Sequence, residues 1–296
     1  MVLTRSSDRD TFMEINTETQ VCGVLGHPVR HSLSPAIHNA AFQHLGLNYV
    51  YLAFPVEDVA HAIPGIRALG NLRGCSITIP HKVSAMAHVD TIDPAAQHIG
   101  AINTIVKSDH TLSGHNTDVS GALRALERAD VALNGQRVVV LGSGGAARAV
   151  AFGLALQTPI AALTLLAIDD AERQRLADDL RVNAACAVDD HPLHADTMQP
   201  ALARAHLVIH CTPVGMDPHP DRTCIPGELL RPHLTVMDIV YNPLDTRMLK
   251  DARQAGCRTI RGLEMFLHQA AAQFELWTGH PAPLDVMRRV VEARLS

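Results

Sequence analysis

The sequence predicts an α/β protein with two domains, the first built on a mostly parallel sheet and the second Rossmann-like. Short runs typical of strands alternate with longer helical patterns, which indicates βαβ units. A length of 296 residues fits about two domains. The apolar run Arg137–Leu141 is followed at once by a glycine-rich turn and a helical pattern, which is typical of a dinucleotide-binding domain.

The first series of elements begins near residue 20. Patterns typical of strands predict them over residues 20–25, 48–54, 74–79 and 102–107. Helices are predicted between these strands over residues 35–46, 56–69 and 81–89. Pro35 suits the first position of a helix, and Gly46 suits the residue after one.

A second series begins at Arg137. Strands are predicted over residues 137–141, 162–168, 207–210, 235–240 and 257–260, with helices over residues 145–156, 171–182 and 246–255. A helix over residues 118–132 joins the two series, and residues 263–277 form one more. The predicted division is an N-terminal tail (1–20), a first domain (21–118), a dinucleotide-binding domain (119–261) and C-terminal helices (262–296).

Composition excludes several classes of protein. The net charge is −5 and no basic stripe is visible, so a nucleic-acid partner is not expected. The most apolar window, residues 149–168, is interrupted by Pro159, which would break a helix crossing a membrane. The polar residues 1–20 are unlike a signal peptide, and the six cysteines form no C-x-x-C pair. We therefore expect a soluble cytoplasmic protein with free thiols.

The turn after residue 141 matches the pattern G-x-G-x-x-A. Gly142 permits a tight turn, Gly144 lets a pyrophosphate approach the backbone, and Ala147 lets the helix pack closely on the strand. The first N–H groups of that helix then face the phosphates. An ordinary turn with small residues is the alternative. The cofactor-binding residues predicted here are Gly142, Ser143, Gly144, Gly145 and Ala146.

The next predicted strand is followed by Asp169 and Asp170. A carboxylate at that strand end can bind the ribose hydroxyls of NAD and would repel the 2′-phosphate of NADP. Either aspartate can instead cap the helix that follows. The sequence therefore favours NAD and leaves NADP possible.

Three clusters in the first domain have chemical character. Ser32 and Ser34 alternate on a loop before a helix, which favours binding of a carboxylate, although one serine can simply be a helix cap. Lys82 falls in the first turn of the helix predicted over residues 81–89. The helix dipole there would lower the pKa of Lys82 and suit it to proton transfer, whereas a solvated surface lysine is the alternative.

The third cluster includes Asn103 and Asp118, within the segments Gly100-Ala-Ile-Asn-Thr104 and Gly114-His-Asn-Thr-Asp118. These side chains are short and rich in hydrogen-bonding atoms, as a polyhydroxylated ligand requires. Taken alone, Asp118 is more readily explained as the cap of the next helix.

Together these segments resemble the shikimate dehydrogenase family, including its quinate/shikimate dehydrogenase branch, over about residues 21–280. The matching motifs occur in the order of the family: Gly26-His-Pro-Val-Arg-His-Ser-Leu-Ser-Pro35, Ile77-Thr-Ile-Pro-His-Lys82, Gly100-Ala-Ile-Asn-Thr104, Asn116-Thr-Asp118, Gly142-Ser-Gly-Gly-Ala-Ala-Arg148, Thr212-Pro-Val-Gly-Met216, Asp238-Ile-Val-Tyr-Asn-Pro243 and Gly262-Leu-Glu-Met-Phe-Leu-His-Gln-Ala-Ala-Ala-Gln273.

The resemblance implies reversible hydride transfer between NAD(P) and a ring hydroxyl of shikimate, and possible action on quinate. It also implies that the last long helix returns to the substrate-binding first domain. The implied roles are as follows: Lys82 and Asp118 as the catalytic pair; Ser32, Ser34 and Tyr241 at the substrate carboxylate; Thr78, Asn103 and Gln269 at ring hydroxyls; Thr212 and Met216 near the nicotinamide; and Gly262, grouped with the cofactor-binding residues, at the turn before the last long helix.

The chain departs from the family at several positions. NADP-using members carry Asn-Arg-Thr where this chain has Ala167-Ile168-Asp169, so the resemblance favours NAD. Ser76 and Val119 replace the usual asparagine and glycine, which bears on the choice of substrate.

Other interpretations stay open at the sequence level. They include a family member that acts on another ring acid, such as an amino-substituted analogue, and a non-catalytic dinucleotide sensor, against which the presence of Lys82 and Asp118 argues. No metal site is expected, because the 18 histidines include no H-E-x-x-H and no standard ligand spacing. We expect a monomer or a homodimer. No motif indicates whether the reaction runs towards oxidation or reduction in the cell.

Overall fold

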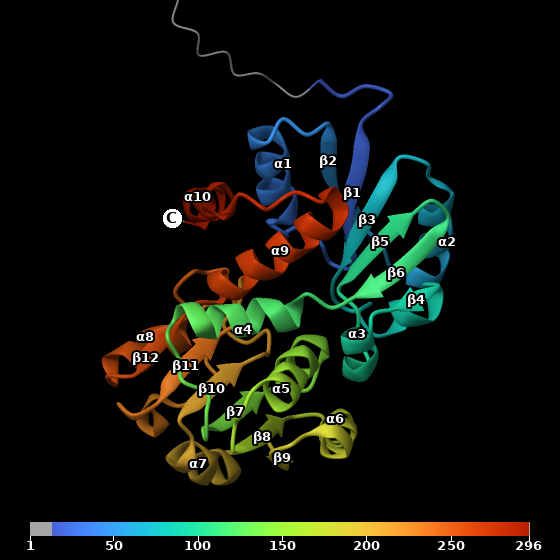
Figure 1. The fold of residues 1–296 in the computed structure, drawn as a ribbon. Helices are drawn as coiled ribbons and strands as arrows, with labels where there is room; N and C mark the ends of the chain where they lie inside the picture. The colour runs from blue at the N-terminus through green and yellow to red at the C-terminus, as the bar shows by residue number, and fades with distance from the viewer. Residues whose placement is uncertain (1–13, 296) are drawn as a thin grey trace, which may run out of the picture.

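A computed structural model describes residues 14–295, which form two α/β domains (Figure 1). The predicted tail, residues 1–20, lies mostly outside these residues. Both predicted sheets are present, and the last long helix runs back to the first domain. The predicted fold class is therefore confirmed.

The first domain contains a mixed six-stranded sheet in the order β2-β1-β3-β5-β6-β4. Strand β1 pairs in parallel with β2 on one side and β3 on the other, whereas β5 and β6 form an antiparallel hairpin beside β3. Its elements are β1 (Gln20–Gly26), α1 (Ser34–His44), β2 (Tyr49–Pro55), α2 (Val59–Ala68), β3 (Leu72–Ile77), the 3-10 helix η1 (Ser84–His88), β4 (Thr91–Ile92), α3 (Pro94–Ile99), β5 (Thr104–Ser108) and β6 (Thr111–His115).

The second domain contains a six-stranded sheet in the order β12-β11-β10-β7-β8-β9, with every pair parallel. This is the doubly wound order, and its ligands bind where the order reverses, beyond the carboxyl ends of β7 and β10. Its elements are β7 (Arg137–Leu141), α5 (Gly145–Gln157), β8 (Ala162–Ala167), α6 (Asp170–Asn183), β9 (Ala187–Pro192), α7 (Ala195–Arg204), β10 (Leu207–His210), the 3-10 helix η2 (Gly227–Leu229), β11 (Thr235–Asp238), α8 (Arg247–Gln254) and β12 (Arg258–Ile260).

Two long helices cross between the domains, α4 (Asp118–Arg128) and α9 (Gly262–Thr278), and they lie against each other (Figure 1). Their contact is close at Gly121, where a Cβ atom would lie 2.8 Å from the Met265 carbonyl oxygen. The apolar face of α9 then enters the first domain, where Phe274 and Trp277 join the core beneath β1 and α1. The final helix, α10 (Leu284–Leu295), packs on α1.

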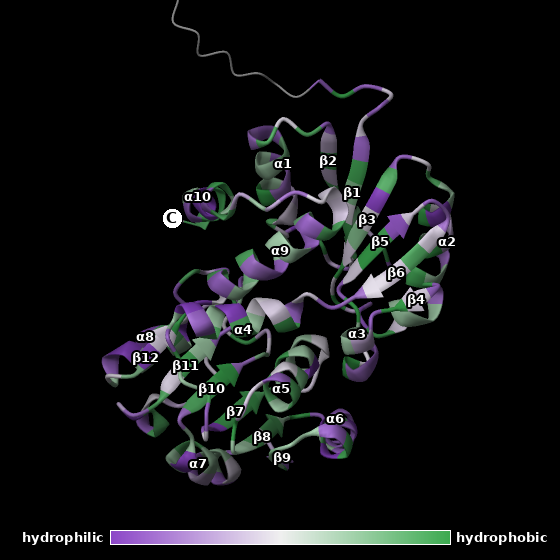
Figure 2. Ribbon diagram, viewed as in Figure 1, coloured by the Kyte–Doolittle hydropathy of each residue, from purple (hydrophilic) through white to green (hydrophobic). Residues whose placement is uncertain are grey.

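Burial follows the expected pattern for a parallel sheet. Strands β7, β8 and β10 are drawn mainly in green in Figure 2, and in β7 the residues from Val138 to Leu141 are almost completely buried. Helix α6 exposes a polar face instead. Within residues 14–295, every helix is too short or too polar to cross a membrane.

Several elements differ from the prediction. The helix predicted over residues 81–89 is wrong, because only the short 3-10 helix η1 forms there. The chain also forms β4, α3, β6, β9, α7 and α10, which were not predicted. Of these, β9 has the sequence Ala-Val-Asp-Asp-His-Pro and lies at the edge of the sheet, where polar residues are tolerated.

Candidate active site

The centre of the candidate site is an ion pair between Lys82 and Asp118. The Lys82 Nζ atom lies 2.5 Å from Asp118 Oδ2, and the two side chains are 16% and 7% exposed. Lys82 comes from the loop after β3, whereas Asp118 is the first residue of α4. Two residues 36 positions apart in the sequence are thus in direct contact, and both side chains are largely shielded from solvent. A short charge-assisted hydrogen bond of this kind can pass a proton to a third group.

Two expectations about this pair require correction. Lys82 lies in a turn before η1 and not in the first turn of an α-helix, so the expected helix dipole does not act on its ammonium group. Considered by itself, Asp118 was expected to cap the following helix, but Thr117 occupies the cap position of α4. The Asp118 carboxylate faces Lys82 and Asn103 instead.

Asn103 fixes the second oxygen of the aspartate. Its amide Nδ2 donates to Asp118 Oδ1 at 2.8 Å and to the Thr117 hydroxyl at 2.9 Å. Its amide oxygen accepts the backbone N–H of Thr117 at 2.8 Å. The residue is 2% exposed. This arrangement holds Asp118 Oδ2 in the direction of Lys82, as pre-organised proton transfer requires.

A buried hydrogen-bond network extends this support, and the sequence analysis missed its centre, Gln273. The Gln273 amide Nε2 donates to the Asn103 carbonyl oxygen at 3.1 Å and to the Thr104 hydroxyl at 2.9 Å. Its Oε1 atom accepts from Ser76, whose Oγ lies 2.6 Å from the hydroxyl of Tyr51. In the sequence, Gln273 could have been noticed as the polar residue that ends the last family motif, residues 262–273.

The glycine turn of the second domain faces the ion pair. A Cβ atom built on Gly145 would lie 3.2 Å from Lys82 Cδ. Cys211, which follows β10, is close enough to both Lys82 and Asp118 to interact with their charges. The two domains therefore meet at this ion pair.

The glycine turn can accommodate a dinucleotide. Gly142 has a φ of +114° and its Cβ position lies 3.0 Å from the Cys211 carbonyl oxygen, so a side chain is excluded there. Nothing lies within 4 Å of the Cβ position of Gly144, which leaves open backbone at the start of α5. No side chain caps this helix, so its first N–H groups remain available to a pyrophosphate. Ser143 donates instead to Glu172 at 2.7 Å, and Ala146 is partly exposed.

At the end of β8, Asp169 caps α6. Its Oδ1 atom accepts the backbone N–H of Glu172 at 2.8 Å, and its side chain remains exposed. Arg173, the first cationic residue after β8, is buried and paired with Asp170 and Asp190. The cap interpretation is confirmed for Asp169, and the loop around it is acidic.

The serine loop lies next to a tyrosine from the second domain. Ser34 is buried at the start of α1 and hydrogen-bonds to Tyr51, while Ser32 Oγ accepts the Ser34 backbone N–H at 3.3 Å. Tyr241 hydrogen-bonds to the Leu33 backbone, and burial raises the pKa of its phenol to about 12. A neutral phenol thus lies beside the loop that carries the two serine hydroxyls.

The other predicted residues come from the loops after β3 and β10 and from α9. Gln269 lies on α9 beside Gly121, which comes three residues after Asp118 on α4. Thr78 directly follows β3, at the end of the strand nearest Lys82. Thr212 lies beside Gly142, where its Cγ2 atom is 3.3 Å from the Cβ position of that glycine. The positions of the remaining residues are as follows: Met216 on the loop after Thr212, and Gly262 at the start of α9, where a Cβ atom would lie 2.5 Å from the carbonyl oxygens of Ile239 and Val240. Gly262 is therefore required by close packing.

The two departures from the family pattern are both internal. Ser76 is part of the hydrogen-bond network around Gln273. Val119 is 5% exposed and packs towards Gly153 of α5, at 2.8 Å from its Cβ position. Ser76 therefore contributes hydrogen bonds to the interior, whereas Val119 contributes packing between α4 and α5.

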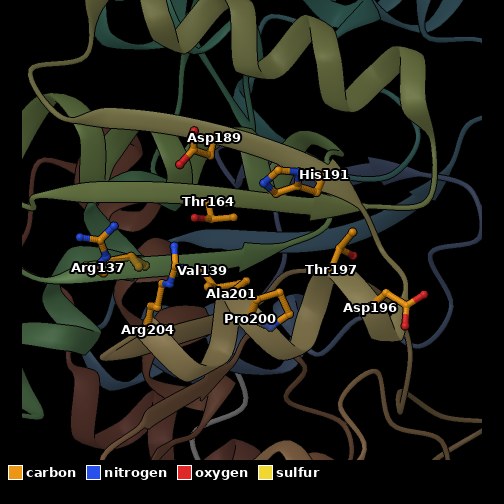
Figure 3. Close-up of a pocket in the computed structure, with 12 residues that line it drawn as sticks. Arg137, Val139, Thr164, Asp189, His191, Asp196, Thr197, Pro200, Ala201 and Arg204 are labelled. Atoms are coloured by element: carbon orange, nitrogen blue, oxygen red, sulfur yellow. The ribbon is translucent and has the colours of Figure 1, made fainter.

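A separate hollow of about 230 Å³ lies between α7 and strands β7, β8 and β9 (Figure 3). Arg137 and Arg204 lie at one end of it, and His191 and Asp196 lie towards the other (Figure 3). It contains none of the site residues predicted from the sequence.

A Rossmann-like domain whose glycine turn faces a lysine–aspartate pair on a second α/β domain defines a dinucleotide-dependent oxidoreductase. Residues 24–105 match the shikimate dehydrogenase substrate binding domain, and residues 262–292 match the shikimate 5′-dehydrogenase C-terminal domain. A shikimate dehydrogenase (NADP(+)) from Moorella thermoacetica is 47% identical over 288 residues, covering 96% of this chain and 97% of the relative. The chain belongs to the shikimate dehydrogenase family.

Solved structures agree with this assignment. Shikimate 5-dehydrogenase from Listeria monocytogenes, in complex with shikimate and NAD, superposes with a TM-score of 0.87 at 36% identity, covering 96% of this chain and 100% of that one. Quinate dehydrogenase from Corynebacterium glutamicum, in complex with NAD, gives a TM-score of 0.85 at 31% identity, covering 93% and 99%.

Proposed function

We propose that this protein catalyses the reversible NAD(P)-dependent oxidation of a ring hydroxyl of shikimate, with 3-dehydroshikimate as the oxidised partner. The observation that carries the proposal is the Lys82–Asp118 pair, joined at 2.5 Å and placed against Gly145 of the cofactor-binding turn. Relatives of this chain carry the same activity in their names.

In this proposal the dinucleotide accepts a hydride from the ring carbon, and the protein handles the proton. Lys82 Nζ takes the proton of the reacting hydroxyl during oxidation and returns one during reduction. Asp118 holds Nζ in position and stabilises its positive charge when the proton has arrived. Asn103 keeps the aspartate from rotating away, through its bond to Oδ1.

Substrate orientation is assigned to the polar groups around the pair. Ser32, Ser34 and Tyr241 would bind the ring carboxylate with neutral hydrogen-bond donors. Thr78, Asn103 and Gln269 would bind ring hydroxyls, each of which needs a polar partner when it leaves water. Thr212 and Met216 would border the nicotinamide, because their loop follows β10 at the reversal of strand order.

The domain division follows the same logic. We assign residues 21–118 to substrate binding, residues 119–261 to the dinucleotide and residues 262–296 to helices that complete the first domain. In support, the first sheet ends at His115 and the second begins at Arg137. Closure of the two domains would align the reacting carbons and exclude water.

A matrix of steady-state rates, shikimate and quinate against NAD and NADP, tests the proposed function. We expect turnover of shikimate with at least one dinucleotide. An absence of turnover in all four combinations, with dinucleotide binding intact, would identify a sensor and not an enzyme. Turnover of an amino-substituted ring acid in preference to shikimate would identify a family member that acts on another ring acid.

For the choice between dinucleotides, we propose that NAD gives the higher kcat/KM. Three carboxylates, Asp169, Asp170 and Glu172, surround the end of β8 where the adenosine ribose would lie. Arg173 is occupied by Asp170 and Asp190 and offers no open fork to a 2′-phosphate. The names of the curated relatives specify NADP(+), so this loop is proposed to distinguish the chain from them.

The expected result is a kcat/KM for NAD at least about tenfold above that for NADP, since each tenfold corresponds to about 1.4 kcal/mol of repulsion or lost pairing. Asp169→Asn should narrow this ratio by removing a charge while keeping an oxygen that can cap α6. Asp196→Asn, at an exposed carboxylate in the first turn of α7, is the matched control and should leave the ratio unchanged. A clear preference of the unmodified enzyme for NADP would refute this assignment.

Gly144→Ala separates cofactor binding from folding. The site has an ordinary φ of −68° and nothing within 4 Å of the added Cβ, so we expect a thermal midpoint close to that of the parent. The same methyl group would occupy the path of the pyrophosphate, so the Kd for the dinucleotide should rise about tenfold or more. Calorimetric unfolding and fluorescence titration measure the two effects.

Gly142→Ala is the contrasting variant, because its backbone conformation and the Cys211 carbonyl both resist a side chain. It should lower the thermal midpoint, whereas Gly144→Ala should not. Unchanged dinucleotide affinity in Gly144→Ala would remove this turn from the binding site.

A further inference from the structure

A second group of reactive side chains lies at the carboxyl ends of β10 and β11, apart from Lys82. His210 and Asp238 are register partners on these neighbouring strands. Asp238 Oδ1 lies 2.9 Å from His210 Nδ1, and the two side chains are 0% and 1% exposed. The other ring nitrogen, Nε2, lies 3.3 Å from the sulfur of Cys224. Carboxylate, imidazole and thiol thus follow one another in the order that activates a cysteine.

Neighbouring groups fix this arrangement. The Asp238 carboxylate accepts the Thr246 hydroxyl at 2.6 Å through Oδ2 and the Val240 backbone N–H at 3.0 Å through Oδ1. These bonds hold the carboxylate against Nδ1, so Nε2 is directed towards the sulfur. The Thr212 hydroxyl lies 2.5 Å from Nε2 and 3.4 Å from the sulfur.

The electrostatics are consistent with the geometry. Burial alone lowers the pKa of His210, but its hydrogen bonds to Asp238 and Cys224 outweigh this effect and raise the pKa to about 9. Burial raises the pKa of the Cys224 thiol, but hydrogen bonding and attraction to His210 lower it below its ordinary value. Burial raises the pKa of the other cysteines in the part of the chain that the structure describes: Cys22, Cys75, Cys186, Cys211 and Cys257.

Access to solvent completes the argument. Cys224 is partly exposed on the loop between β10 and η2, whereas Cys22, Cys75 and Cys257 are buried. A thiol that is both activated and accessible reacts faster than its neighbours with soft electrophiles. We propose that Cys224 is a thiol-modification site that reacts with small disulfides by exchange.

The step is balanced without any other reagent. The Cys224 sulfur attacks one sulfur of the small disulfide, so that a new S–S bond forms and the original one breaks. The departing thiolate takes the proton held on His210. Cys224 is oxidised to a mixed disulfide, and half of the small disulfide is reduced to a free thiol.

The position of the mixed disulfide would affect the cofactor side of the cleft. Thr212 contacts both Cys224 and the turn at Gly142. If the proposed function holds, on which this one consequence rests, modification should raise the KM for the dinucleotide. The modification itself is measured without an activity assay, so its failure is distinguishable from a failure of the proposed function.

The experiment incubates the whole protein with oxidised glutathione at neutral pH and follows the added mass and its position by mass spectrometry. We expect the first glutathione on Cys224 and its loss in Cys224→Ser. Cys186→Ser, at another partly exposed cysteine whose pKa is raised, is the matched control and should react like the parent. His210→Asn should slow the reaction about tenfold or more, because the imidazole no longer stabilises the thiolate.

A second measurement does not depend on the folding of the histidine variant. The ultraviolet absorbance of the thiolate, taken as the difference between the parent and Cys224→Ser, should titrate below the ordinary range of a cysteine. Titration within or above that range, reaction at Cys186 as fast as at Cys224, or an unchanged rate in a folded His210→Asn would each overturn the proposal.

Discussion

Replacing Lys82 by alanine is expected to lower kcat/KM for shikimate oxidation by about 10³-fold or more, with the fold retained. Positioned acid–base groups contribute about 10²–10⁴ to rates, and a 10³-fold loss corresponds to about 4 kcal/mol of transition-state stabilisation. The loss should appear mainly in kcat, because Lys82 accepts the hydroxyl proton in the transition state and not in the bound ground state. Steady-state kinetics with saturating dinucleotide measure it.

The matched control is Lys107→Met. Lys107 is also buried, at 7% exposure, but it lies on strand β5, outside the site. Its ammonium group donates to the Leu69 carbonyl oxygen at 2.8 Å. This variant should lose some stability and keep its kcat within a few-fold of the parent. Turnover by Lys82→Ala within about tenfold of the parent would remove Lys82 from the chemistry.

Replacing Trp277 by alanine is expected to lower the free energy of unfolding of the first domain by about 3–5 kcal/mol. The indole is 5% exposed, donates to the Ile105 carbonyl oxygen at 3.0 Å and packs on His38 and Tyr51, with ring centroids 5.4 and 5.8 Å away. Its loss leaves a cavity and removes a hydrogen bond between α9 and the first sheet. Thermal and urea unfolding, followed by circular dichroism, measure the change.

Leu276→Ala is the control on the same helix, because Leu276 is 42% exposed. It should cost much less than the change at Trp277. Trp277→Phe should recover part of the stability, since a ring still fills the space without the hydrogen bond. A loss below about 1 kcal/mol in Trp277→Ala would mean that α9 is not needed to complete the core.

The sequence predicted the second sheet best. Its central strands are continuous apolar runs bounded by turns, and β7 and β10 begin and end at the predicted residues. The glycine turn was recognisable because its chemistry is local. The loop at Lys82 was not, since a run of helix-forming residues is prevented from forming a full helix by its contacts with Val56 and Ile102.

The candidate site was predictable as a set of residues but not as a network. Gln269 and Gln273 lie four positions apart on one face of α9, and the pattern alone does not distinguish their partners. Only the packing of α9 against β3 and β5 places Gln273 within reach of Asn103 and Ser76. In the same way, Cys224 and His210 meet because a loop folds back over a strand end.

The path of α9 also has a consequence for biosynthesis. Because Phe274 and Trp277 complete the core beneath the first sheet, the N-terminal half of the chain leaves the ribosome without the residues that cover it. The Rossmann-like half takes only Met265 of α9 into its buried core, so most of that core is complete once β12 has been made. During translation, the second domain to be made is therefore the first that can finish folding, and the first waits for the last helices to arrive.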